Sequence, residues 1–199
     1  MREKLREGSM KRRLLGLVVF LAALGLYSAL TSAGTFAVGG IHLSGDMEIS
    51  DEKVELTNGA TLELSGAPWK CDVCGKTAQD TLVTARTITA NLKKADKKLT
   101  ITEAVATTDV IIHARQVDKV KKTTRFIHAT GNKAVFTPAA GDKDATIVLT
   151  GNAAVKLTDP DLEEPATLTG SEVTVYLNKN KINVKSGDMR VKPKEGAQQ

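Results

Sequence analysis

The sequence predicts an all-β domain of antiparallel strands that follows an apolar N-terminal segment. Beyond Gly40, apolar and polar residues alternate with a period of two, and no stretch shows a convincing helical period of 3.6 residues. Short runs of Gly, Asn, Asp and Lys separate the alternating segments, as is typical of hairpin loops. A chain of 199 residues accommodates one such domain and one additional segment.

The additional segment is the N-terminus, where basic residues precede an apolar stretch. Residues 1–13 contain six Lys or Arg and two Glu, so this basic n-region carries +4 of the net charge of +5. Leu14–Leu30 has no charge and would span about 25 Å as a helix. Extension to Val38 makes the segment 14–38 long enough to cross a bilayer, whereas Thr31-Ser32-Ala33 suits a cleavage site. We therefore expect either one transmembrane helix or a cleaved signal helix, with residues 1–13 in the cytoplasm and the remainder exported.

Six segments show the strand alternation most clearly. Each places aliphatic side chains on one face and Thr, Asn, Lys or Glu on the other. They are Thr61–Leu64, Arg86–Leu92, Lys98–Ile101, Thr146–Leu149, Glu172–Leu177 and Lys181–Lys185. Hairpin loops are expected at Asn58-Gly59, Lys94–Lys97, Ala140–Lys143 and Asn178–Lys181. The predicted sheet is a meander with one dry face.

A loose glycine repeat accompanies these strands. Gly131, Gly151, Gly170 and Gly187 follow one another at intervals of 20, 19 and 17 residues, and we expect each to begin or end a strand pair. A single hairpin cannot bury its apolar face alone. Successive units are therefore expected to form a sandwich, a jelly roll or a short solenoid. The polar segment 192–199 is expected to be a disordered tail.

Charged segments offer weaker functional signals. The loop Asp159–Pro165 is expected to be solvated, with calcium binding by its carboxylates as the alternative. The lysine-rich turns at Lys93–Lys98 and Lys119–Lys122 are either solvated or in contact with anionic lipid headgroups.

Composition and motifs argue against two large classes of function. Aromatic residues make up 4% of the chain and residues 14–199 carry a net charge of only +1, which disfavours nucleic-acid binding. The chain has no Gly-rich phosphate loop, no G-x-S-x-G and no H-E-x-x-H motif. We therefore expect no enzyme, no catalytic residue and no cofactor. His42, His113 and His128 are expected to be ordinary side chains without partners.

The one sharp local motif is Cys71-x-x-Cys74, within Trp69–Gly75. In an exported protein, the first interpretation is a disulfide between Cys71 and Cys74 that closes a hairpin loop. A zinc site needs four ligands, so the pair would need the three histidines or a second chain. A redox pair and two free thiols are the remaining alternatives.

A recurrent pattern in the second half of the domain carries a family resemblance. Ala129–Phe136, Ile147–Val155 and Leu168–Tyr176 follow one another in order and spacing. They resemble the OstA-like domain of the LptA/LptC family of lipopolysaccharide transport proteins, in which a G-x-x-A-x-aromatic strand leads to an L-x-G-x-A/V-x-V strand. The resemblance covers residues 85–191, and residues 43–64 more loosely. The Cys71-x-x-Cys74 motif departs from the family pattern.

The resemblance implies a β-jelly roll, or curled β-taco, over residues 39–191. Its inner apolar face would shield the acyl chains of lipid A while the sugars stay in water. The domain would then be a conduit for the lipid in the periplasm, either anchored at the inner membrane or soluble. The implied partners are lipopolysaccharide, the Lpt ABC transporter and other OstA-like jelly rolls joined by edge-strand addition.

The candidate lipid-binding residues are those that the alternation places on the inner face. They are Leu64, Ile88, Ile101, Ile112, Phe126, Phe136, Ile147, Leu149, Val155, Val173, Val175 and Ile182. The alternative is that this face makes a closed core, as in a β-solenoid scaffold that binds no lipid.

Overall fold

The computed structural model describes residues 32–66, 69–71, 76–78, 80–95, 98–118, 121–179 and 181–194. All regular secondary structure in these ranges is β, and the strands pair antiparallel, so the predicted all-β class is confirmed. Residues 1–13 and most of the segment 14–38 lie outside the described residues. Within the described ranges there is no helix with the length and apolar character needed to cross a bilayer.

Ten strands form one sheet and two short strands form another. Their bounds are β1 Ser32–Val38, β2 Ile41–Ile49, β3 Lys53–Leu64, β4 Trp69–Cys71, β5 Lys76–Ala78, β6 Thr81–Ala85, β7 Thr87–Ala95, β8 Lys98–Asp118, β9 Thr123–Thr137, β10 Thr146–Thr158, β11 Ala166–Tyr176 and β12 Lys181–Arg190. The large sheet runs in the order β1-β2-β3-β6-β8-β9-β10-β11-β12. β7 also pairs with β3 and β8, so β6 and β7 act as one strand interrupted at Arg86. The sheet is the predicted meander, and β4–β5 is a hairpin outside it.

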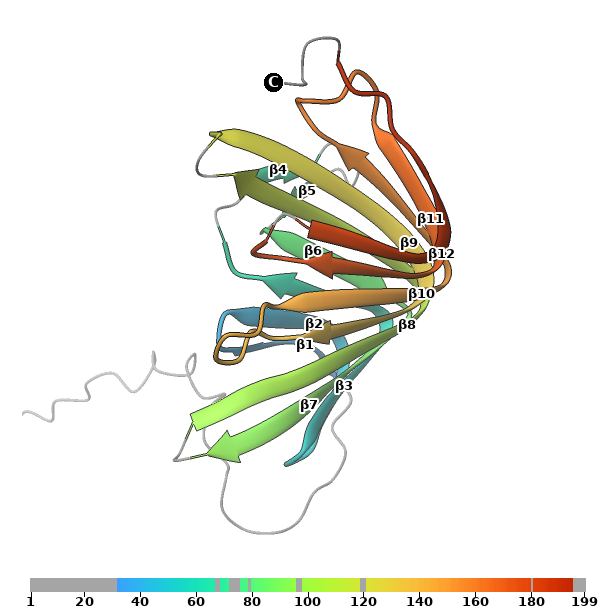
Figure 1. Ribbon diagram of the computed structural model, residues 1–199. Coiled ribbons are helices and arrows are strands. Elements are labelled where there is room, and N and C mark those ends of the chain that lie inside the picture. The colour runs from blue at the N-terminus through green and yellow to red at the C-terminus, as the bar shows by residue number, and fades with distance from the viewer. Residues whose placement is uncertain are drawn as a thin grey trace, which may run out of the picture.

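The large sheet bends along a line that crosses its long strands, on the right of Figure 1. Bulges increase local twist and let a strand turn a corner. The line is marked by register shifts at Ser44/Asp46, Thr107/Val110 and Thr150/Ala153 and by positive φ at Asn58, Thr108, Asp109, Asn152 and Ser186. The bend folds the sheet into two layers. The first layer contains β6, the second contains β7, and the long strands run through both.

The regularly spaced glycines lie on this bend and not at the ends of strand pairs. Gly151 has a φ of +73°, a conformation that residues with a Cβ rarely adopt. A Cβ on Gly170 would lie 2.8 Å from Val184 Cγ1 and 2.9 Å from the Lys185 carbonyl oxygen. Each repeat of 17 to 20 residues therefore corresponds to one long strand that crosses both layers and the turn that leads to the next strand.

One predicted hairpin is wrong, and three are confirmed. Asn58-Gly59 does not end a strand, because β3 pairs with β2 on both sides of it, through Thr57–Asp46 and Thr61–Ser44. The positive φ angles of Asn58 and Gly59 form a bulge on the bend line instead of a hairpin loop. The other three predicted loops connect β7 to β8, β9 to β10 and β11 to β12.

The ordered domain extends beyond both predicted bounds, 39 and 191. Ser32–Val38, which we assigned to the apolar N-terminal segment, forms β1 and pairs with β2 along its length. At the other end, the sequence predicts a disordered tail from residue 192, which includes residues 192–194. They are ordered against the β10–β11 connection, where Leu162 pairs with Pro193.

Candidate functional site

Continuous rows of apolar residues cross the inner faces of both layers. The alternation sends every second side chain inward, and the strand register aligns these side chains from strand to strand. In the first layer the row is Leu43, Leu62, Val83, Ile112, Ala129, Val155, Leu168 and Met189. In the second layer it is Met47, Leu56, Ile88, Ala106, Ala134, Leu149, Val173 and Val184.

Over most of the sheet these rows pack against each other in one hydrophobic core. An internal pocket between them, next to Ile88 and Phe136, has a volume of only ≈ 10 Å³. Nine of the twelve candidate lipid-binding residues are buried in this core: Ile88, Ile101, Ile112, Phe136, Ile147, Leu149, Val155, Val173 and Val175. Leu64 and Ile182 are partly buried against it. The structure therefore brings eleven of the twelve residues together, in a core that is closed along most of its length.

The packing loosens at β12, and we call this region the open end. Ile182 and Val184 are only partly buried, and Met189 is 62% exposed. Two pockets, of ≈ 710 and ≈ 220 Å³, lie here, and Leu168, Ile182 and Met189 line both. Among the described strands β12 pairs only with β11, so it is an edge strand of the sheet.

Polar groups are buried beside the smaller pocket. Gln116 on the first layer is 4% exposed, and its Nε2 donates a hydrogen bond to the Tyr176 carbonyl oxygen of β11, 2.9 Å away. Arg125 forms an ion pair with Asp159, whose side chain is 5% exposed. These groups give the open end both apolar walls and fixed polar partners, which suits an amphipathic ligand.

We call the segment Val191–Lys194 the C-terminal strap. Together with the β10–β11 loop, residues 159–165, it closes one side of the smaller pocket. Two backbone hydrogen bonds join them, from Glu163 N to Lys192 O at 3.0 Å and from Lys194 N to Asp161 O at 3.3 Å. Leu162 from the loop and Val191 from the strap both line the pocket.

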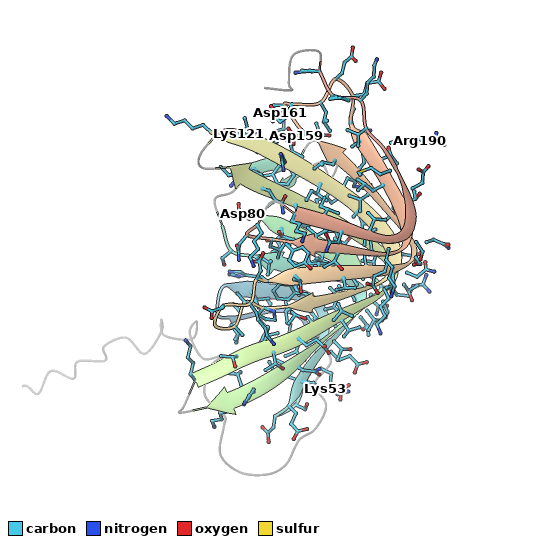
Figure 2. The ribbon with its side chains drawn as sticks, in the orientation of Figure 1. Lys53, Asp80, Lys121, Asp159, Asp161 and Arg190 are labelled. Atoms are coloured by element: carbon cyan, nitrogen blue, oxygen red, sulfur yellow. The ribbon has the colours of Figure 1, made fainter. Side chains whose placement is uncertain are left out.

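Ion pairs reinforce this contact. Lys192 Nζ lies 2.9 Å from Glu163 and 3.5 Å from Glu164, and the hydrogen bond to Glu163 raises the pKa of Lys192. Lys121 Nζ lies 3.2 Å from Asp161, and Figure 2 shows Lys121, Asp159 and Asp161 together at this end of the molecule. The carboxylates of the loop, which we expected to be solvated or to bind calcium, are therefore paired with lysine and arginine.

Phe126 is the one candidate that does not face inward. Its neighbour Ile127 is buried in the core, whereas Phe126 lies on the outer face and is 39% exposed. There its ring packs against Trp69 of β4, with 5.1 Å between the ring centroids. The prediction that Phe126 points inward is wrong, and this contact places the β4–β5 hairpin on the outer face of the first layer.

The prediction that the three histidines have no partners is wrong. His42 Nε2 lies 3.0 Å from Ser65 Oγ, and the Nδ1 atoms of His113 and His128 are 3.3 Å apart. Burial, and then the nearby Lys156 ammonium, lower the pKa of His128. The spacing predicts this pair, because the antiparallel pairing of Asp118 with Thr123 places position 113 opposite position 128.

Several predictions fall outside the described part of the chain. The thiols of Cys71 and Cys74 lie outside it, and so do Lys97 and Lys119 of the lysine-rich turns. In the ranges that are described, no three His, Cys, Asp or Glu residues gather as a metal cluster. Comparison with protein-family models and with curated proteins finds no match.

Proposed function

We propose that the protein binds the acyl chains of lipopolysaccharide between its two layers and relays this lipid across the periplasm, without catalysing a reaction. The observation that carries the proposal is the inner apolar face, which continues from the closed core to uncovered side chains at the open end. Met189 is exposed there, although it continues the same cross-strand row as Leu168 and Val155. Covering apolar surface favours binding by about 25 cal/mol per Å².

The bent sheet supports a more specific assignment of the fold, a β-jelly roll of the OstA-like kind. The motifs at Ala129–Phe136, Ile147–Val155 and Leu168–Tyr176 fall on β9, β10 and β11. Their glycines, Gly131, Gly151 and Gly170, lie where the two layers meet. The resemblance is thus carried by residues with a common structural role in the bend.

Acyl chains would enter at the open end and extend inward only as the two layers separate. The core holds no space for a chain, because the pocket beside Ile88 and Phe136 is ≈ 10 Å³. The larger pockets are at β12, where the polar parts of the lipid would remain in water beside Arg125 and the C-terminal strap. Binding at Ile182 and Met189 therefore precedes binding at Ile147 or Val175.

The sheet edges support the proposed partners. β1 pairs only with β2 and β12 only with β11 among the described strands, so both edges present unpaired backbone groups. Such edges recruit further strands. We propose that other OstA-like jelly rolls and the Lpt ABC transporter bind there. The part of the segment 14–38 that precedes β1, residues 14–31, would hold the protein at the inner membrane or serve as its signal.

A matched pair of variants tests the lipid site. Met189→Glu introduces a charge at the open end, and we expect it to weaken binding of fluorescent lipopolysaccharide to the purified protein at least about tenfold. Arg190→Gln changes the net charge by the same amount on the neighbouring, exposed residue and should bind as the wild type does. Equal binding by both variants, with unchanged circular dichroism, would contradict the proposal.

The closed core favours one alternative, a β-solenoid scaffold anchored to the inner membrane that binds no lipid. The protein's own side chains bury Ile88, Ile147 and Val173 fully. The same titration separates the two functions, since a scaffold leaves the fluorescence of the lipid unchanged with wild-type protein and with both variants.

A further inference from the structure

The proposed function does not explain a pair of histidines on the outer face of the sheet, opposite the inner apolar face. His113 on β8 and His128 on β9 are directly opposite each other in the antiparallel register. Their Nδ1 atoms are 3.3 Å apart, and their ring centroids are 4.7 Å apart with the planes inclined at 42°. Ala114 and Ile127, the adjacent pair, face the core, so the two imidazoles face away from it.

The separation of the two Nδ1 atoms is that of two ligands on one tetrahedral metal ion. Zinc binds histidine nitrogen at about 2.0–2.1 Å, and a tetrahedral angle between two such bonds sets the nitrogens about 3.3 Å apart. The ion would lie between the two rings, within bonding distance of both Nδ1 atoms. Cross-strand pairing fixes both backbone positions, so the site is preorganised.

The surroundings shelter this position from water. His113 is 6% exposed, and Leu82, its partner on β6, is fully buried on the same face although it is outside the main core. The β4–β5 hairpin covers this side of the sheet through the contact between Trp69 and Phe126, two residues before His128.

We propose that His113 and His128 bind a divalent transition-metal ion, of which zinc(II) is the first candidate, through their Nδ1 atoms. In the metal-free pair one Nδ1–H donates to the other Nδ1. When the metal binds, that proton moves to Nε2 of the same ring, so each Nδ1 lone pair reaches the ion. No oxidation or reduction accompanies the step.

The described residues supply two ligands, and no third His, Cys, Asp or Glu among them completes a cluster. The histidine pair leaves two positions of a tetrahedral ion for other ligands. In the sequence, Cys71 and Cys74 have the C-x-x-C spacing of zinc ligands, and Cys71 is the last residue of β4. The proposal rests on the histidine pair, and the cysteines enter as variants in its test.

The test is a titration of the full-length, metal-free protein with zinc(II) and, for its absorption spectrum, cobalt(II). We expect one ion per chain, with affinity reduced more than about tenfold in His113→Ala and in His128→Ala. His42→Ala is the matched control, because His42 is exposed and contacts Ser65 instead. Absence of zinc binding by the wild type, or wild-type affinity in both outer-face variants, would overturn the proposal.

A second variant guards against simple misfolding. Lys156 is opposite His128 on β10, and its positive charge opposes a cation at the site. We expect Lys156→Ala to bind zinc about two- to fivefold more tightly, which an unfolded protein cannot imitate. Unchanged or weaker binding by Lys156→Ala would place the ion elsewhere and overturn the proposal.

The cysteine variants then define the rest of the coordination sphere. If Cys71→Ser and Cys74→Ser weaken binding as the histidine variants do, the proposal holds with four protein ligands. If only the histidine variants weaken it, the proposal holds with water as the remaining ligand. If only the cysteine variants weaken it, the site is made of thiolates alone and the proposal fails.

Discussion

Gly170 lies on the bend, where the neighbouring strand leaves little space for a side chain. A Cβ would lie within 2.9 Å of both Val184 Cγ1 and the Lys185 carbonyl oxygen. We expect Gly170→Ala to lower the free energy of unfolding by about 1–3 kcal/mol, because the strands must move apart. Urea denaturation followed by circular dichroism measures this change. Thr169→Ala, on the exposed neighbour, should stay within about 0.5 kcal/mol of wild type, and an equal loss in both would contradict the account.

Arg125 and Asp159 provide a second prediction at the scale of single residues. Asp159 is 8% exposed and is ion-paired with Arg125, so removal of the arginine leaves a carboxylate with little access to water. We expect Arg125→Leu to destabilise the protein by about 3 kcal/mol, and the double variant Arg125→Leu/Asp159→Leu to recover most of that loss. The urea midpoints of the three proteins test this. Additive losses would show that the two side chains do not depend on each other.

Phe126 shows where residue-level prediction from the alternation fails. Phe136 and Phe126 are ten residues apart on β9, so strict alternation places both on the inner face. The register shift between β8 and β9 near Gly131 reverses the alternation, and Phe126 therefore faces outward. A bulge depends on the partner strand, so the sequence of β9 alone does not reveal it.

The C-terminal strap belongs to the scale of elements, and its charges give a third prediction. Lys192 is paired with Glu163 and Glu164, and Lys194 Nζ donates to the Pro160 carbonyl oxygen at 2.8 Å. We expect the double variant Lys192→Glu/Lys194→Glu to release the strap from the acidic loop through repulsion of like charges. The amide of Glu163, which donates to Lys192 O, should then exchange its hydrogen faster.

Hydrogen exchange of the same amide in Lys181→Glu/Lys185→Glu is the control. These lysines lie on β12 but outside the contact between strap and loop, so Glu163 should remain as protected as in wild type. Unchanged protection in the Lys192→Glu/Lys194→Glu variant would mean that the backbone pairing alone holds the strap.

The strands themselves were largely predictable, and the bend was not. The alternation with a period of two corresponds to observed strands. Three of the four expected loops correspond to observed connections between strands. Asn58-Gly59 has the same local chemistry in a hairpin and in a bulge, and only the pairing of Thr57 and Thr61 with one strand distinguishes them. Likewise, the glycine repeat was visible in the sequence, but its meaning depends on contacts between neighbouring strands.

At the scale of the whole molecule, the sequence indicates which side chains face inward but not how closely the two layers approach. Ile112 and Leu149 belong to apolar rows on opposite layers, and each is only 1% exposed. Whether such rows close on each other or leave a groove depends on the angle of the bend and on links such as Gln116 to Tyr176. These are long-range properties, so the open end at β12 could not be located from the sequence.

The central claim is that acyl chains of lipopolysaccharide bind at the open end, and photo-crosslinking in cells tests it most directly. A photoreactive residue at Met189 or Ile182 should yield a lipopolysaccharide adduct, because both side chains line the pockets at β12. The same residue at Lys156, on the outer face beside His128, should yield none. Adducts at Met189 and Ile182 alone are the predicted result. No adduct at either position in folded, exported protein, or an equal adduct at Lys156, would contradict the account.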